Sequence, residues 1–308
     1  MNNYFLKALN QENEAPYIPV WLLRQAGRYM PEYREVRSQY KDFFEMIKKP
    51  EICKELTLQP LNAFDLDAAI TFTDILTIPD ALGLKVNFVK GKGPIFEKSL
   101  SSMDKIDLNT NEFHDKIHYV YSATSLIKEN VNVPLIGFTG SPWTLFVYMF
   151  YGQSPKDFKS IQSYISENSR DAETYLQILT DCCIEYAKKQ VQHGADCIQI
   201  FDSWAGILEN NYVDFSLKYV NQIYEALNEE VPLILYNRGK LLSSFVDKSA
   251  FKAYSINSSD RIENYIDENI TIQGNLNPVF FKKNQEEIEL KAREIFTKFK
   301  NRKNYIFN

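Results

Sequence analysis

The feature that most constrains the fold is the regular alternation of short apolar runs with helical patterns along all 308 residues. Continuous apolar runs are typical of strands that are buried on both faces of a parallel sheet. Strands are expected at residues 18–23, 68–72, 134–138, 197–201, 233–236, 251–256, 270–273 and 305–307. Helical patterns separate them, among others at residues 111–129, 171–193, 212–228 and 288–299. This alternation, without repeat or linker, predicts an α/β protein whose residues 1–308 form a single (β/α)8 TIM barrel domain.

An open doubly wound sheet is the alternative architecture. No Gly-x-Gly-x-x-Gly motif follows the first strand, and the number of strand-helix units is that of the barrel. The chain ends at Asn308, directly after the last strand. The prediction is therefore a barrel that lacks its last βα loop and helix, with one flank of the last strand uncovered.

Charge and composition limit the classes of partner that this protein is expected to bind. The 40 acidic and 35 basic residues give a net charge of −5, whereas nucleic-acid-binding proteins usually carry a basic surface. No apolar run approaches the ~18 residues of a membrane span, and no signal peptide is recognisable. The four cysteines show no metal-ligand spacing and are interpreted as reduced thiols of a cytoplasmic protein.

The first apolar run leads into two arginines, Arg24 and Arg28, four residues apart around Gly27. Residues at this spacing share a face if the turn is helical. A guanidinium is always charged and offers a planar fork of donors that suits carboxylates and phosphates. The alternative is that both are surface arginines paired with nearby acids such as Glu32.

In a barrel the functional groups sit on the loops that follow the strands. The polar residues just past the later strands are Asp74, the segment leading to Tyr148, Asp202, Ser203, Asn237, Arg238 and Asn275. Cations, one acid and neutral hydrogen-bonding groups suit a ligand that carries several carboxylates together with N–H donors.

Each candidate also has a structural alternative. Asp74 and Ser203 could cap helices, Tyr148 could be a core residue, and Asp202 could pair with an arginine. His114 and His118 are four residues apart and could hold a metal. The apolar face of their helix lies elsewhere, so we expect both on the solvated side and predict no metal site.

The segment Arg-Gln-Ala-Gly-Arg-Tyr-Met-Pro-Glu-Tyr-Arg at residues 24–34 resembles the N-terminal signature of the uroporphyrinogen decarboxylase family. Further segments similar to that family follow in its order at residues 69–76, 91–96, 137–145, 199–206 and 273–278. The resemblance implies removal of carbon dioxide from the four acetate side chains of uroporphyrinogen III, which gives coproporphyrinogen III in haem biosynthesis. It also implies that no metal or organic cofactor takes part, and that the enzyme is a cytoplasmic homodimer.

The resemblance assigns roles to individual residues. It implies that Asp74 faces the pyrrole N–H groups and that Arg24 and Arg28 hold substrate carboxylates, with Arg24 also catalytic as a proton donor. It further implies that Tyr148 and Ser203 supply hydroxyl groups to the site and that Phe201 lines the cleft. Gln25 lies inside the motif and is expected to support the turn.

Three departures from the family pattern keep alternatives open. The family continues after the last strand with Leu-Gly-His-Gly and a closing helix, so this chain is interpreted as truncated and without the site histidine. The usual Lys-Gly after the fifth strand is Arg238-Gly239, and the usual Asp-Trp of the sixth strand is absent. The hypotheses are an active decarboxylase, a catalytically impaired tetrapyrrole-binding relative, and a corrinoid-linked methyltransferase, which would need a zinc site of histidine and cysteines.

Overall fold

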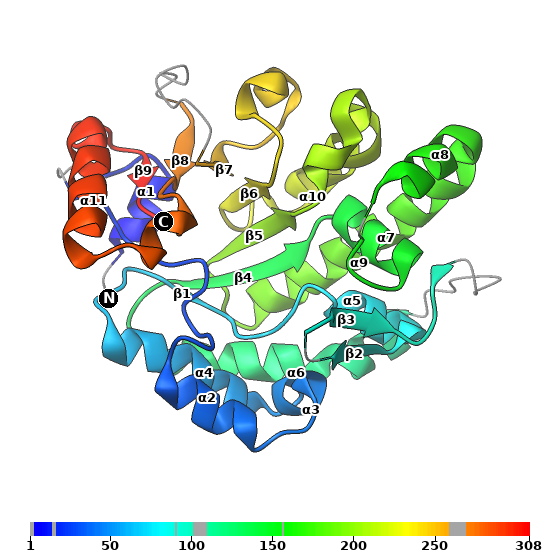
Figure 1. The fold of residues 1–308 in the computed structure, drawn as a ribbon, viewed down its shortest axis with the longest axis horizontal. Coiled ribbons are helices and arrows are strands. Elements are labelled where there is room, and N and C mark those ends of the chain that lie inside the picture. Colours follow the sequence, from blue (N-terminus) through cyan, green and yellow to red (C-terminus); the bar gives the residue numbers. More distant parts are fainter. Residues whose placement is uncertain (1–2, 14–16, 90, 101–109, 156, 259–268) are drawn as a thin grey trace.

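The main sheet of the computed structural model consists of seven parallel strands in a TIM-barrel-like α/β arrangement (Figure 1). The model describes residues 3–13, 17–89, 91–100, 110–155, 157–258 and 269–308. The strands follow one another in the order β1 (Ala69–Ile70), β4 (Leu135–Gly140), β5 (Cys197–Asp202), β6 (Leu233–Asn237), β7 (Ala253–Ser255), β8 (Thr271–Gln273) and β9 (Tyr305–Ile306). Apart from the first, the expected strands are therefore confirmed to within a few residues.

Helices alternate with the strands along the chain, as the sequence predicts. They are α1 (Tyr4–Leu9), α2 (Pro31–Ser38), α3 (Phe43–Ile47), α4 (Pro50–Ala63), α5 (Thr77–Pro79), α6 (Thr110–Lys128), α7 (Pro142–Tyr151), α8 (Lys159–Glu167), α9 (Ser169–Gln192), α10 (Lys218–Leu227) and α11 (Gln285–Phe299). Every residue of β4 is buried, which is the pattern expected of a strand with both faces covered. None of the helices in the described ranges is long and apolar enough to cross a membrane.

The predicted first strand at residues 18–23 is wrong as a strand, because it forms only a parallel bridge at Val20. Pro19 has no N–H to donate, and the N–H of Val20 goes to the Asp67 carboxylate at 2.8 Å. The segment still joins the two ends of the sheet. Trp21 N donates to Phe307 O at 3.2 Å, and Asp67 N donates to Val20 O at 2.8 Å.

The last strand is better covered than the sequence predicts. Tyr305 and Ile306 are fully buried and Phe307 is 7% exposed. The side chains of the last strand are therefore covered, contrary to the expected uncovered flank. The rings of α11 stack on the strand, since Phe299 lies 4.0 Å from Tyr305 and Phe296 lies 4.8 Å from Phe307. On the other side, α1 packs against Ile306 in the same hydrophobic cluster (Figure 1).

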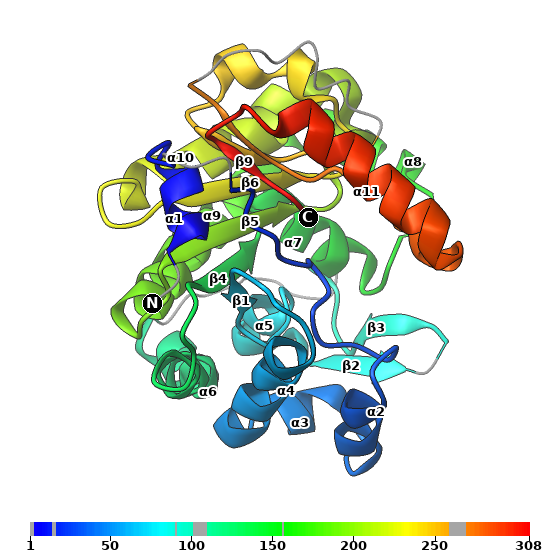
Figure 2. The same cartoon turned by 90° about the vertical axis from the view of Figure 1, so that its left-hand side faces the viewer.

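A hairpin of β2 (Val86–Val89) and β3 (Gly93–Phe96) stands apart from the main sheet (Figure 2). It packs next to α3, where the Phe43 and Phe88 rings lie 4.8 Å apart. This layer of helices and hairpin encloses the segment after β1, which carries Asp74.

Candidate active site

A cavity of about 310 Å³ opens where the parallel strands end. It is lined by Leu23, Arg24, Gln25, Ala26, Leu56, Thr57, Ile70, Thr71, Phe72, Thr73, Asp74, Ile75, Phe138, Phe201, Ser203, Tyr236 and Arg238. In barrels of parallel strands this end is where active sites are found. Of the seven predicted site residues, Arg24, Gln25, Asp74, Phe201 and Ser203 therefore share one cavity.

Asp74 follows β1 and is half-buried in the wall of the cavity. Its Oδ1 accepts the N–H of Leu76 at 2.8 Å, and its backbone oxygen accepts the Thr77 hydroxyl at 2.7 Å. One carboxylate oxygen thus closes a turn just before α5, and α5 itself has no side-chain cap. Burial raises the pKa of Asp74 to about 6, and the bond from Leu76 opposes that rise.

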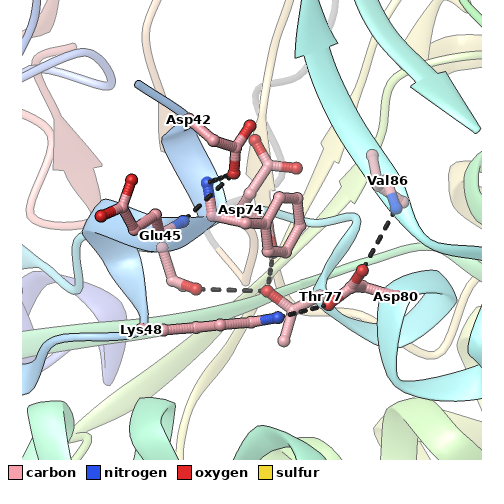
Figure 3. Close-up of polar contacts among 9 residues, drawn as sticks. Asp42, Glu45, Lys48, Asp74, Thr77, Asp80 and Val86 are labelled. Carbon is pink, nitrogen blue, oxygen red and sulfur yellow. Dashed lines mark hydrogen bonds and ion pairs between the residues drawn. The ribbon is translucent and has the colours of Figure 1, made fainter. Parts of the chain in front are cut away.

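The segment that holds Asp74 is fixed from outside by an ion pair. Figure 3 shows Lys48, whose Nζ lies 3.1 Å from Asp80 Oδ2. The other oxygen of Asp80 accepts the N–H of Val86 at 3.1 Å. The end of α3 and the start of the hairpin are thereby tied to the turn that follows Asp74.

The two arginines of the first motif are not equivalent. Both are exposed, but Arg24 lines the cavity and Arg28 does not. The condition for a shared face, a helical turn, is not met, because residues 24–28 form turns instead of a helix. The turn is closed by Met30 N, which donates to Gly27 O at 2.9 Å, and the Arg28 charge lies near Tyr33 of α2.

Gln25 supports the turn, as expected, through contacts that its spacing does not predict. Its side chain is 2% exposed and pairs with the backbone of the β1 region. Nε2 donates to Ala68 O at 2.6 Å, and Oε1 accepts from Ile70 N at 3.3 Å. The amide therefore replaces strand pairing and holds Arg24 at the rim of the cavity.

An aromatic wall on neighbouring strands completes the cavity. Phe201 is in edge-to-face contact with Phe138 at 5.4 Å and with Tyr236 at 5.5 Å. Tyr148 does not line the cavity; it is half-buried and packs edge-to-face on Trp204 at 5.9 Å. Tyr148 still interacts electrostatically with the site, because burial and then the Asp74 charge raise the pKa of Tyr148.

Asp202 lies behind this wall, fully buried, and bonds to hydroxyl groups instead of an arginine. The hydroxyls of Ser141 and Ser216 each donate to it at 2.7 Å, and that of Thr144 lies at 3.4 Å. Burial raises the pKa of Asp202, while these hydroxyls and that of Tyr212 oppose the rise. Because Ser141 also caps α7, the carboxylate joins α7 to the end of β5, next to Phe201 and Ser203.

Tyr236 and Arg238 line the cavity but were not among the predicted site residues. Arg238 is one of the polar residues just past a strand, which was the available signal. Tyr236 carried no signal, because an aromatic residue in a buried run is usually core.

In the described part of the chain, the histidines and cysteines do not form a metal-ligand cluster. His114 Nδ1 lies 3.0 Å from the Tyr121 hydroxyl, and His118 Nδ1 lies 3.1 Å from Ser122 Oγ. All four cysteines are buried. Within the part of the chain that the structure describes, no three His, Cys, Asp or Glu side chains form a metal-ligand group.

The resulting site combines Arg24 and Arg238 with one partly buried carboxylate, that of Asp74, against an aromatic wall. Cationic forks at a rim bind carboxylates. A carboxylate that is partly removed from water interacts more strongly with a positive charge or N–H donors. The arrangement is therefore suited to a ligand that carries carboxylates together with N–H donors or positive charge.

Comparison with known proteins agrees with this chemistry. Residues 1–308 match the family described as uroporphyrinogen decarboxylase (URO-D). The uroporphyrinogen decarboxylase of Ruthia magnifica subsp. Calyptogena magnifica is 39% identical over 305 residues, which cover 94% of this chain and 87% of that protein. The uroporphyrinogen decarboxylase of Dichelobacter nodosus is 39% identical over 317 residues, which cover 100% of this chain and 91% of that protein.

A similar solved structure is a methyltransferase from Methanosarcina mazei, with a TM-score of 0.79 over 99% of this chain and 91% of that one. At 19% identity this similarity concerns the fold alone. The family match along the whole sequence and the identities near 40% are far more specific. This chain belongs to the uroporphyrinogen decarboxylase family.

Proposed function

We propose that this protein is a uroporphyrinogen decarboxylase, a carboxy-lyase that converts uroporphyrinogen III to coproporphyrinogen III in haem biosynthesis. The observation that carries the proposal, beyond family membership, is that Arg24 and Asp74 line the same cavity. They bring together a group that binds carboxylates and a group that stabilises positive charge, which are the two needs of this reaction.

In the proposed mechanism a proton adds to the pyrrole carbon next to the one that bears the acetate, and the ring becomes cationic. The bond to the carboxylate then breaks, carbon dioxide leaves, and the electron pair neutralises the ring. The remaining methylene carbon takes a proton to become a methyl group while the first proton leaves the ring. Ionised Asp74, aimed at the pyrrole N–H groups, stabilises the cationic state most in a site that excludes water.

Arg24 is proposed to hold the carboxylate that leaves and to take part in the proton transfer, and Arg28 to hold an outer carboxylate at the rim. Gln25 fixes the Arg24 turn. Phe201 and Ser203 are proposed to contact the macrocycle from the wall formed by β5. Tyr148 is proposed to act from behind that wall, close enough for electrostatic coupling to Asp74.

The direct test is anaerobic turnover of uroporphyrinogen III by the 308-residue chain, with products separated by their number of carboxyl groups. Coproporphyrinogen III is the expected product. A folded chain that binds the substrate and releases no product would instead identify a tetrapyrrole-binding relative without turnover.

Replacing Arg24 with alanine is expected to lower kcat/KM about 100-fold, because one charge-assisted, bidentate contact to the substrate is lost. Arg28→Ala is expected to raise KM by a smaller factor, about threefold, since its side chain lies outside the cavity. Steady-state kinetics with uroporphyrinogen III measure both. An unchanged KM in Arg28→Ala would remove Arg28 from the substrate site, and wild-type kinetics in Arg24→Ala would remove the proposed role of Arg24.

A homodimer with the two cavities facing each other is also proposed. Large apolar side chains are exposed in loops at the same end of the barrel as the cavity: Tyr29 at 54%, Leu241 at 50%, Val279 at 57% and Phe281 at 58%. Light scattering after gel filtration is expected to give twice the 35.9 kDa mass of the chain. Phe281→Asp combined with Leu241→Asp is expected to give monomers, and dimers that persist would show that another face pairs.

The finer architecture proposed is a single barrel domain over residues 1–308. In it the bridge segment around Val20 occupies the position of an eighth strand, between β9 and β1. The proposed location is the cytoplasm, and the four free, buried thiols suit its reducing conditions.

A further inference from the structure

Arg238 lies in the same cavity as Arg24 and Asp74, at the end of a strand on a different part of the barrel. We infer that Arg238 is a further substrate-binding residue, which anchors a second carboxylate of the tetrapyrrole. The inference rests on the proposed function and adds to it a cationic contact from the loop that follows β6.

The charge of Arg238 is available for a ligand. Among the residues that the structure describes, neither Arg238 nor Arg24 forms an ion pair. Both charges reach the same ring: burial raises the pKa of Tyr236, and Arg238 and then Arg24 oppose the rise. Two cations that act on one side chain favour an anionic ligand at that place.

The backbone holds Arg238 in place before any ligand binds. Its N–H donates to Asp202 O at 3.1 Å, and its own oxygen accepts from Gly206 N at 3.1 Å. The next residue, Gly239, is in contact with Gly206, where an added Cβ would lie 2.7 Å from Gly239 O. Gly239 N also donates to Asn257 Oδ1 at 3.2 Å. A cation on a preorganised loop loses little freedom on binding, which favours its use as an anchor.

Lys240, two residues further along, provides the contrast. Its Nζ donates to the backbone oxygen of Glu209 and lies 5.9 Å from the centre of the Tyr212 ring. It does not line the cavity. The same loop therefore carries one cation that contacts Glu209 and Tyr212 and one that lines the cavity. Lys240→Ala removes the same charge from the same loop and is the matched control.

The test compares Arg238→Ala, Arg238→Lys and Lys240→Ala in binding and in turnover. Binding is measured by fluorescence titration with uroporphyrin, the oxidised octacarboxylate, and with coproporphyrin, the tetracarboxylate. Arg238→Ala is expected to weaken uroporphyrin binding about tenfold and to raise KM for uroporphyrinogen III by a similar factor, with kcat nearly unchanged. Arg238→Lys is expected to recover most of the affinity, because it keeps the charge, and Lys240→Ala to change it less than about twofold.

Equal affinities in Arg238→Ala and Lys240→Ala would overturn the inference, as would a lower kcat with unchanged KM in Arg238→Ala. These outcomes differ from a failure of the proposed function. In that case the wild-type chain itself gives no coproporphyrinogen III, whatever the residue at position 238.

Discussion

Replacing Asp74 with alanine is expected to lower kcat for uroporphyrinogen III by about 1,000-fold or more while the protein remains folded. In the proposed mechanism the carboxylate stabilises a cation that exists only after the ring is protonated. Removing one preorganised electrostatic group of this kind costs about 100- to 1,000-fold in enzymes, and a full charge at the centre of the reaction is at the upper end. The test is to measure kcat for the formation of coproporphyrinogen III, and to record circular dichroism to check that the variant is folded.

Asp74→Asn is the matched control, because its side-chain oxygen can still accept the N–H of Leu76. Since burial raises the pKa of Asp74 from 3.8 to about 6 in the folded protein, ionising it costs folding free energy. The stabilisation from the protonated form is full below about pH 4 and is lost as the pH rises through about 6. Asp74→Asn is therefore expected to be at least as stable as the wild type at pH 7 and to be nearly inactive.

The same pKa sets the pH dependence of activity. Catalysis needs the ionised carboxylate. The kcat of the wild type is therefore expected to fall tenfold for each pH unit below the pKa that Asp74 has in the complex with substrate. In the free protein this pKa is about 6. The residual activity of Asp74→Asn should lack this step. Activity close to wild type in Asp74→Ala would refute the proposed mechanism.

Replacing Asp202 with alanine is expected to destabilise the fold by about 3 kcal/mol or more. The carboxylate is fully buried, and its removal leaves the hydroxyls of Ser141 and Ser216 without the acceptor that they have at 2.7 Å. Hydrogen bonds to a charged group contribute about 1.5–3 kcal/mol each, and buried donors without an acceptor are costly. Urea unfolding measures the effect as a lower midpoint at unchanged slope.

Ser216→Ala is the control for Asp202, because it removes one of the donors and leaves the carboxylate and the Ser141 contact in place. A loss of about 1 kcal/mol is expected. A change below 1 kcal/mol in Asp202→Ala would contradict the proposed importance of the buried carboxylate. Because Asp202 joins α7 to the end of β5, the alanine variant is also expected to loosen the wall that carries Phe201 and Ser203.

Several features followed from the sequence because they depend on local pattern. Continuous apolar runs identified the seven strands of the main sheet, and the alternation with helices predicted that it is parallel. The rule that active groups follow strands then placed Asp74 at the end of β1 and Ser203 at the end of β5. The motif that begins at Arg24 identified the family. None of these inferences needs a distance between residues far apart in the chain.

Other features were decided only by tertiary structure, because they depend on how loops and side chains meet. The spacing of Arg24 and Arg28 left open whether they share a face, and turns place only Arg24 in the cavity. Pairing of Gln25 with the β1 region, the hydroxyl groups around Asp202, and the backbone bond from Arg238 to Asp202 all join residues distant in sequence. Periodicity fixes which residues lie on a strand or helix, whereas these contacts are fixed by the packing of different segments against one another, which no local pattern encodes.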